Sequence, residues 1–158
     1  MQLSHRRPVA SALFDDPNLV SCAGLVPVAA LAQRCGLAEL ADGHLRVPTD
    51  KGSHAGAKVS ALVAGMVAGA DSIADMGLLR HGAMGTIFAR PYAPSTLGSF
   101  LRAFTFGHVR QLDAVATRLL AGLHEHTPML AGIDGPVMVD LDDTIIEVHG
   151  YAKQGSGY

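Results

Sequence analysis

The sequence predicts a mainly α protein in which a helical N-terminal region is followed by the first strand or hairpin of an α/β domain. Residues 25–126 carry apolar residues at helical spacing and are divided by glycine and proline. After Gly132 the pattern changes to a β-branched apolar run bounded by Gly135 and Pro136. A lone strand or hairpin is not stable. We therefore expect a helical domain over residues 1–130 and a truncated α/β domain over residues 131–158.

Composition supports a globular protein. The 158 residues are 49% hydrophobic and 16% charged, which excludes a disordered chain and allows a substantial core. Cys22 and Cys35 are too few and too far apart for a disulfide framework or a metal knuckle. The longest apolar run, Val59–Ala70, is shorter than the roughly 18 residues of a membrane span. We expect a cytoplasmic protein with no membrane partner and a buried helix over this run.

Glycine, proline and capping residues predict the first helices. Gly36 ends the first one, Ser53 is expected to cap the third, and Ser72 with Asp75 resembles a capping box in which Asp replaces Glu. The expected helices are 25–34, 37–42, a segment from Ser53 to about Ala68, a segment opened by the capping box and ending at Arg80, and 83–88.

Two further helices are predicted after the prolines at 91 and 94. Ser95 is expected to cap residues 96–104, and Thr105 to cap the longest helix, which ends near Glu125. The longest helix has apolar residues at three- and four-residue steps, which predicts one apolar face: Val109, Leu112, Ala116, Leu119 and Leu123.

The middle of the chain is basic. Residues 80–118 contain five arginines and one acidic residue, Asp113. Such a segment can contact phosphates, although an ordinary solvated helix face produces the same pattern. The arginines that we predict to bind DNA are Arg80, Arg90, Arg102 and Arg110.

The candidate catalytic and metal-binding residues lie near the carboxyl end, in the segment Asp140-Leu141-Asp142-Asp143-Thr144. Side chains of a strand alternate between its faces, so Asp140 and Asp142 share one side. Closely spaced carboxylates repel one another unless cations neutralise them, and oxygen ligands suit Mg²⁺ or Mn²⁺. A turn in which Asp142 or Asp143 is the capping residue is the structural alternative.

Two enzyme classes have acidic residues in this arrangement, on or directly after an apolar strand. A phosphatase of the haloacid dehalogenase type opens with an apolar strand and D-x-D-x-T, in which the first Asp is the nucleophile. Residues 137–145 fit that pattern locally. An RNase-H-like nuclease or transposase instead carries its first metal-binding Asp on its first strand, after a helical DNA-binding region. The order of segments in this chain matches the second class.

The sequence resembles the N-terminal part of a bacterial insertion-sequence DDE transposase, in the group numbered thirteen-eighty of the IS-four superfamily. The resemblance extends from about Gly24 to the last residue. It is carried by HAGAKVSALVAGMVAGADSIADM, by APSTLGSFLRAFTFGHVRQLDAVATRLLAGL and by VDLDDTIIEVHGYAKQGSGY.

This resemblance implies a function and its site residues. The first catalytic Asp of the superfamily stands in an Asp-x-Thr pattern, which assigns Asp142 first, Asp140 second and Asp143 third, with Asp142 and Asp140 as ligands of Mg²⁺ or Mn²⁺. The implied partners are DNA, at the terminal inverted repeats of the element, and a second copy of the chain. The family's second Asp and its Glu lie further downstream, so we expect this fragment to be inactive alone and not to bind the metal stably. A phosphatase fragment and a non-catalytic helical DNA-binding protein are the alternatives.

Overall fold

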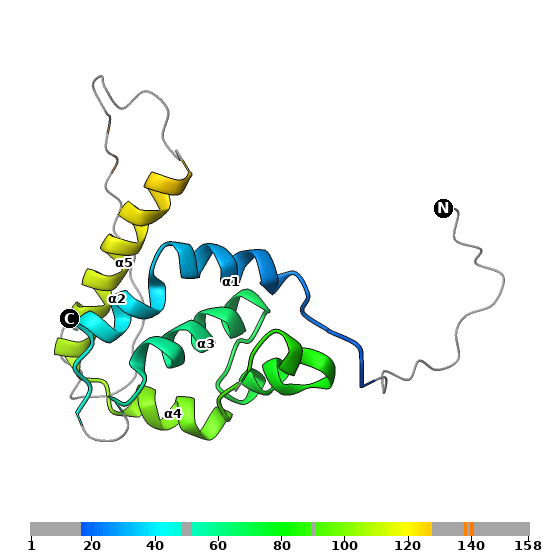
Figure 1. Cartoon of the computed structure of the whole chain (residues 1–158). Helices are drawn as coiled ribbons and strands as arrows, with labels where there is room; N and C mark the ends of the chain where they lie inside the picture. Colours follow the sequence, from blue (N-terminus) through cyan, green and yellow to red (C-terminus); the bar gives the residue numbers. More distant parts are fainter. Residues whose placement is uncertain (1–16, 49–51, 90, 128–137, 139, 141–158) are drawn as a thin grey trace.

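The computed structural model describes residues 17–48, 52–89 and 91–127, together with Met138 and Asp140 (Figure 1). These residues are mainly helical, and no strand is assigned among them. The elements in chain order are α1 (Leu25–Arg34), α2 (Leu37–His44), α3 (Ala55–Val67), the 3₁₀ helices η2 (Ala74–Arg80) and η3 (Gly82–Thr86), α4 (Pro94–Arg102) and α5 (Phe106–His126). The predicted helical class is confirmed for this part of the chain, whereas the predicted strand falls almost wholly outside it.

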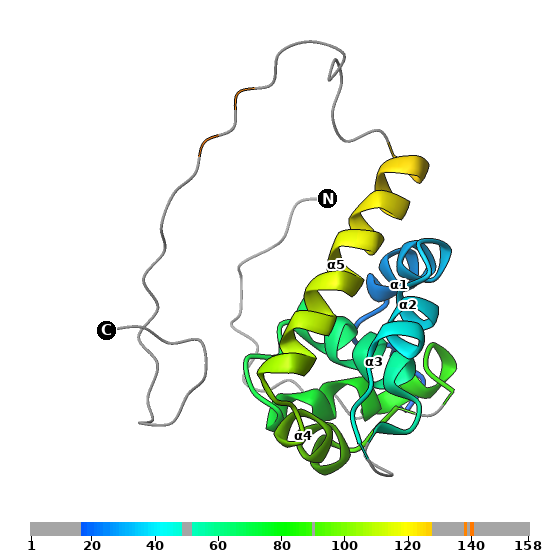
Figure 2. The same ribbon diagram turned by 90° about the vertical axis from the view of Figure 1, so that its left-hand side faces the viewer.

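Helix α3 is the centre of the bundle, as its apolar sequence predicts. Its first half packs against α2, and its other contacts are with α1, η2 and α4. Figures 1 and 2 show α5 running along one side of the bundle beside α2, with α4 below α3 in the first view. Because its neighbours cover it on several sides, α3 needs apolar residues around most of its circumference.

Two apolar clusters flank α3. The first lies between α2, α3, α4 and α5 and contains Leu37, Ala41, Leu45, Val47, Ala55, Val59, Phe100 and Val115. The second lies between α1, α3, α4 and the 3₁₀ helices and contains Leu25, Ala61, Ala64, Met76, Leu79, Met84 and Leu97. In the second cluster, the absence of a side chain at Gly65 leaves room for the Met76 thioether, since an added Cβ would overlap it. Gly69, with φ +94°, follows the end of α3 in the left-handed region.

The start of α3 differs from the prediction. His54, with φ +54°, precedes the first helical residue, and Ser53 does not cap the helix. The amide of Gly56 instead donates a hydrogen bond to Asp42 Oδ1 at 2.7 Å. A carboxylate of α2 therefore satisfies the free amide and interacts favourably with the helix dipole. Neighbouring residues in the sequence do not predict this cap, because its donor and its acceptor belong to different helices.

Two of the other predicted caps are confirmed and one is wrong. The amide of Ser72 donates to Asp75 Oδ2 at 2.9 Å and the amide of Asp75 donates to the Ser72 hydroxyl at 3.4 Å, although the segment that follows is 3₁₀ rather than α-helical. Thr105 precedes α5 in a capping box in which its amide donates to Nδ1 of His108 at 2.9 Å. Helix α4 begins at Pro94, before Ser95, because the fixed φ of proline suits the first helical position and needs no hydrogen-bond acceptor.

The Ser72–Asp75 pair makes stability depend on pH. The hydrogen bond from the Ser72 hydroxyl is the main cause that lowers the pKa of Asp75. A carboxyl whose pKa is lower in the folded state stabilises the fold above its unfolded pKa of about 3.9. This contribution is lost as the pH falls through the folded value. We expect Asp75→Asn to lower the melting temperature slightly at pH 6, and the difference from wild type to shrink below pH 4.

Thermal unfolding followed by circular dichroism at several pH values checks this prediction. Asp71→Asn, at an exposed position in the same turn, is the matched control. A difference for Asp75→Asn that does not change with pH would contradict the assigned role of its carboxylate.

Polar contacts fix α5 on the loop that follows α2 and on the end of α1. Gln111 Oε1 accepts a hydrogen bond from the amide of Arg46 at 2.8 Å. His108 Nε2 lies 3.2 Å from the carbonyl oxygen of Arg46, and His126 Nε2 lies 3.1 Å from that of Arg34. Nδ1 of His108 accepts from the Thr105 amide, so its Nε2 carries the proton and donates to Arg46.

The apolar face of α5 that packs inward is rotated from the predicted one. Val115 is its buried residue, and Leu112 and Leu119 pack against the first cluster. Val109 and Ala116, which were predicted on the inner face, are exposed. The sequence did not distinguish these faces because both are apolar.

Candidate functional site

The acidic segment lies almost entirely outside the described residues. Asp142 and Asp143, the first and third candidates for the catalytic carboxylate, are not among them. Asp140 is described and exposed. Met138, at an expected strand position, is 97% exposed, and neither Met138 nor Asp140 is assigned to a strand. The strand and the order of the three carboxylates therefore stay predictions.

The metal assignment also stays a prediction. Asp140 and Asp142 offer carboxylate oxygens, which are suitable ligands for Mg²⁺ or Mn²⁺, but only Asp140 can be placed. Across residues 17–48, 52–89, 91–127, 138 and 140, no three His, Cys, Asp or Glu side chains are close enough to hold a metal ion. The helical bundle thus supplies no cluster of this kind from its described side chains.

Three of the four predicted DNA-binding arginines can be placed. Arg80 is the last residue of η2, Arg102 is the last residue of α4, and Arg110 lies on α5; Arg90 is outside the described residues. All three placed side chains are exposed. The contact between η2 and α4 places Arg80 and Arg102 on neighbouring elements, whereas α5 lies along another side of the bundle (Figure 1).

The arginines also differ in the contacts that their side chains make. The Arg102 guanidinium donates to the Ser99 hydroxyl at 3.2 Å and forms no ion pair with any described residue. Arg110 instead forms an exposed ion pair with Asp113, with Nη1 and Oδ2 3.3 Å apart. A cation at a helix C-terminus is also favoured by the helix dipole, which explains Arg80 and Arg102 without any ligand. Arg80 and Arg102 are still the better phosphate-contact candidates, because among the described residues only Arg110 of the three forms an ion pair.

Lys58 was not singled out from the sequence. It lies on α3, is 5% exposed, and places Nζ 5.3 Å from the ring centre of Phe100 and 6.0 Å from that of Tyr92. Attraction between a cation and an aromatic ring offsets part of the cost of burying the ammonium group. The only signal in the sequence is a lysine inside an otherwise apolar helix. Its surroundings indicate a structural role in the core.

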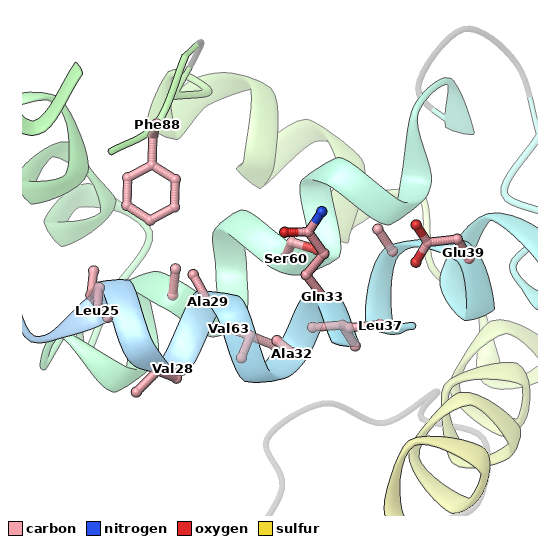
Figure 3. A pocket seen from close by; sticks show the side chains of 12 residues that line it. Leu25, Val28, Ala29, Ala32, Gln33, Leu37, Glu39, Ser60, Val63 and Phe88 are labelled. Carbon is pink, nitrogen blue, oxygen red and sulfur yellow. The ribbon is translucent and has the colours of Figure 1, made fainter. Parts of the chain in front are cut away.

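An apolar pocket of about 260 Å³ lies between α1 and α3. Figure 3 shows aliphatic side chains of α1 facing α3 across it, with Phe88 toward one end and Glu39 toward the other. Its polar lining residues are Gln33, Glu39 and Ser60. The pocket is therefore a mainly apolar depression with few polar groups, and no sequence pattern predicted it.

Comparison with known proteins finds no similar family or fold. No protein-family model matches the chain, and neither a curated protein nor a solved structure is significantly similar to it.

Among the described residues, no helix is both long and apolar enough to cross a membrane.

Proposed function

We propose that this chain is part of a DDE transposase, in which the helical bundle contacts DNA and the acidic segment contributes to the catalytic site. The observation that carries the proposal is the order of two segments. A helical body, with exposed Arg80 and Arg102 on neighbouring elements, precedes a segment in which Asp142, Asp143 and Thr144 fit the Asp-x-Thr pattern. The sequence resemblance to the thirteen-eighty group gives this order its functional meaning.

The proposed chemistry is phosphoryl transfer on DNA. When bound, two divalent cations promote attack by water or a 3′-hydroxyl and stabilise the leaving oxygen. Asp142 and Asp140 would supply carboxylate ligands, and the remaining ligands would come from an Asp and a Glu elsewhere in the transposase. Arg80 and Arg102 would contact phosphates and orient the duplex without reading its sequence. The described helices thus position DNA, and the acidic segment provides part of the reacting centre.

Binding to the element's ends tests the proposal. Fluorescence anisotropy of the full chain would be measured with a labelled duplex that carries the inverted repeat flanking the reading frame. A scrambled duplex of equal length is the control. We expect tighter binding to the inverted repeat at about 100 mM salt. Absence of binding to either duplex, even at about 50 mM salt, would overturn the proposed DNA-contact role.

Substitution of single arginines tests which residues contact the DNA. Arg80→Ala and Arg102→Ala are each expected to weaken binding to both duplexes by about three- to tenfold, because phosphate contacts are independent of sequence. Arg118→Ala is the matched control, since Arg118 is also exposed but lies on α5, along another side of the bundle from η2 and α4 (Figure 1). Equal losses in all three variants would indicate only a diffuse charge effect and contradict the assignment.

The local fit of residues 137–145 to the D-x-D-x-T pattern favours a second candidate, a phosphatase of the haloacid dehalogenase type. In that mechanism Asp140 attacks phosphorus and Asp142 protonates the leaving group. Hydrolysis of p-nitrophenyl phosphate by the full chain, abolished in Asp140→Asn, would decide for the phosphatase. A non-catalytic helical DNA-binding protein is the third candidate, and DNA binding without hydrolysis of p-nitrophenyl phosphate would distinguish it from the phosphatase.

A further inference from the structure

The pocket between α1 and α3 exists because small side chains face each other across it. Ala29 and Ala32 on α1 and Ala64 on α3 line it. Alanine fills little of the space between two packed helices, so a space of about 260 Å³ remains between them. Atoms that line such a space lack dispersion contacts on one side, and a ligand that fills it restores these contacts. The pocket is therefore suited to an apolar group.

The apolar part of the pocket has a closed end and an open side. Leu25 at the start of α1 is 4% exposed, and Figure 3 shows Phe88 at the same end of the pocket. Val28 also lines the pocket but is 38% exposed, so the pocket opens to solvent there. A cavity of about 150 Å³ holds one benzene molecule, so by proportion a pocket of about 260 Å³ takes an apolar group of about ten non-hydrogen atoms.

The polar groups of the pocket lie away from its closed end. They belong to Gln33, Glu39 and Ser60, which Figure 3 shows between the middle of the pocket and the end opposite Leu25 and Phe88. In that view the Glu39 carboxylate is directed toward Gln33 and Ser60. Within the part of the chain that the structure describes, none of these three side chains forms a hydrogen bond or an ion pair with another residue. Their polar atoms are therefore available to a ligand.

The charge of the lining favours a cationic ligand. Glu39 is the only charged residue among the described residues that line the pocket. Its carboxylate attracts a cation and repels an anion. The side-chain oxygens of Gln33 and Ser60 are further acceptors for a group that donates several hydrogen bonds, as an ammonium group does.

We propose that this pocket binds a small amphiphilic amine, with its apolar body between α1 and α3 and its ammonium group beside Glu39. The apolar body extends toward Leu25 and Phe88. The ammonium group donates hydrogen bonds to Glu39 and to the side-chain oxygens of Gln33 and Ser60. A mostly apolar pocket with a few convergent polar groups, between the helices of a bundle, is the usual form of a small-molecule site. The proposal does not rest on the transposase assignment, because this binding needs neither DNA nor metal.

The apolar body supplies most of the affinity, and the carboxylate supplies the preference among ligands. For a ligand of about ten non-hydrogen atoms we expect a dissociation constant of about 10–100 μM. Glu39 is exposed, so water screens its attraction for a cation and the pair changes the affinity by no more than about fivefold. Glu39 also lies in the first turn of α2, where the helix dipole favours an acidic residue. That stabilising role produces no preference among ligands.

Isothermal titration calorimetry of the full chain with three probes of one chain length tests the proposal. The probes are n-octylamine, n-octanol and n-octanoate, at pH 7 and about 50 mM salt. We expect n-octylamine to bind about three- to fivefold tighter than n-octanol, and n-octanoate to bind most weakly. In Glu39→Gln the preference for the amine should disappear, while n-octanol binds as it does to wild type.

Three results would overturn the proposal. One is no binding of n-octylamine up to about 1 mM, well above the expected dissociation constant. Another is equal affinity of the wild type for all three probes, which would indicate apolar adsorption alone. The third is a preference for the amine that survives in Glu39→Gln.

Substitution of two neighbouring alanines of α1 tests the location. Ala29→Leu places a larger side chain in the pocket and should weaken n-octylamine binding by about tenfold or more. Ala30→Leu is the matched control, because Ala30 is exposed and does not line the pocket. Equal affinities of the two variants for n-octylamine would contradict the location. Circular dichroism would establish that both variants, and Glu39→Gln, remain folded.

A second depression of about 250 Å³ shares Ser60 and Phe88 with the pocket. Amide chemical shifts in NMR spectra distinguish the two locations. We expect n-octylamine to shift the amides of α1, which lines only the first pocket. Shifts confined to Ile87 and Tyr92, which line only the second depression, would place the ligand there and contradict the proposal.

Discussion

Gly56→Ala is expected to lower the free energy of unfolding by about 3 kcal/mol, because α2 and α3 cross at this residue without space for a side chain. An alanine methyl group would overlap the carbonyl oxygen of Ala38, which belongs to the backbone of α2 and cannot rotate away. It would also approach Asp42 Oδ2 to 2.7 Å and disturb the hydrogen bond between Asp42 and the Gly56 amide. The two helices would have to separate, and the first apolar cluster would loosen with them.

Urea unfolding followed by circular dichroism measures this effect. Gly43→Ala is the matched control, because Gly43 lies within α2 and an added Cβ there meets no atom within 4 Å. We expect that control to be neutral or stabilising by about 0.5–1 kcal/mol, as glycine is a poor helix former. Gly56→Ala as stable as Gly43→Ala would show that the crossing of α2 and α3 is wider than described.

Phe100→Ala is expected to cost about 3–5 kcal/mol, a large share of the total stability of an ordinary domain. Phe100 is 1% exposed and belongs to the first cluster. Its ring packs edge-to-face on Phe104, with ring centres 5.0 Å apart, and lies under the ammonium group of Lys58. Truncation leaves a cavity and also removes an aromatic face from a buried cation, so the two costs add.

Phe100→Leu separates these two contributions. Leucine fills much of the volume but offers no aromatic face to Lys58, so we expect an intermediate loss of stability. Leu101→Ala is the control on the same helix, since Leu101 is 38% exposed and its truncation should cost less than about 1 kcal/mol. If Phe100→Ala and Leu101→Ala had similar unfolding midpoints, the placement of Phe100 at the centre of the cluster would be wrong.

Local signals predicted much of the fold. The helix over residues 25–34 ends where Gly36 adopts φ +74°, and Thr105 marks the start of α5. These signals work because a glycine or a capping side chain acts on its own helix. The cap from Asp42 to Gly56 could not be found in this way, because it joins two helices. The 3₁₀ geometry after Ser72 was missed as well, since a capping box does not distinguish the two helix types.

Fewer features of the candidate site than of the fold could be predicted from the sequence. Charge counting identified an arginine-rich segment, but it could not tell that Arg110 is paired with Asp113 while Arg80 and Arg102 end two neighbouring helices. The spacing of apolar residues in α5 predicted one apolar face. It did not show which side of the helix packs against α2, because apolar residues lie on both sides. The three clustered carboxylates remain a prediction from sequence, because Asp142 and Asp143 lie outside the described residues.

The salt dependence of DNA affinity tests the proposed DNA-contact role most directly. The protein has a formal net charge of −2, so a basic total charge does not explain any binding. The affinity of the full chain for the inverted-repeat duplex should fall linearly on a log–log plot between about 50 and 200 mM salt, with a slope of about −2 or steeper. Arg80→Ala and Arg102→Ala should each make that slope shallower by about one unit. A slope that neither substitution changes would contradict the proposed contact surface.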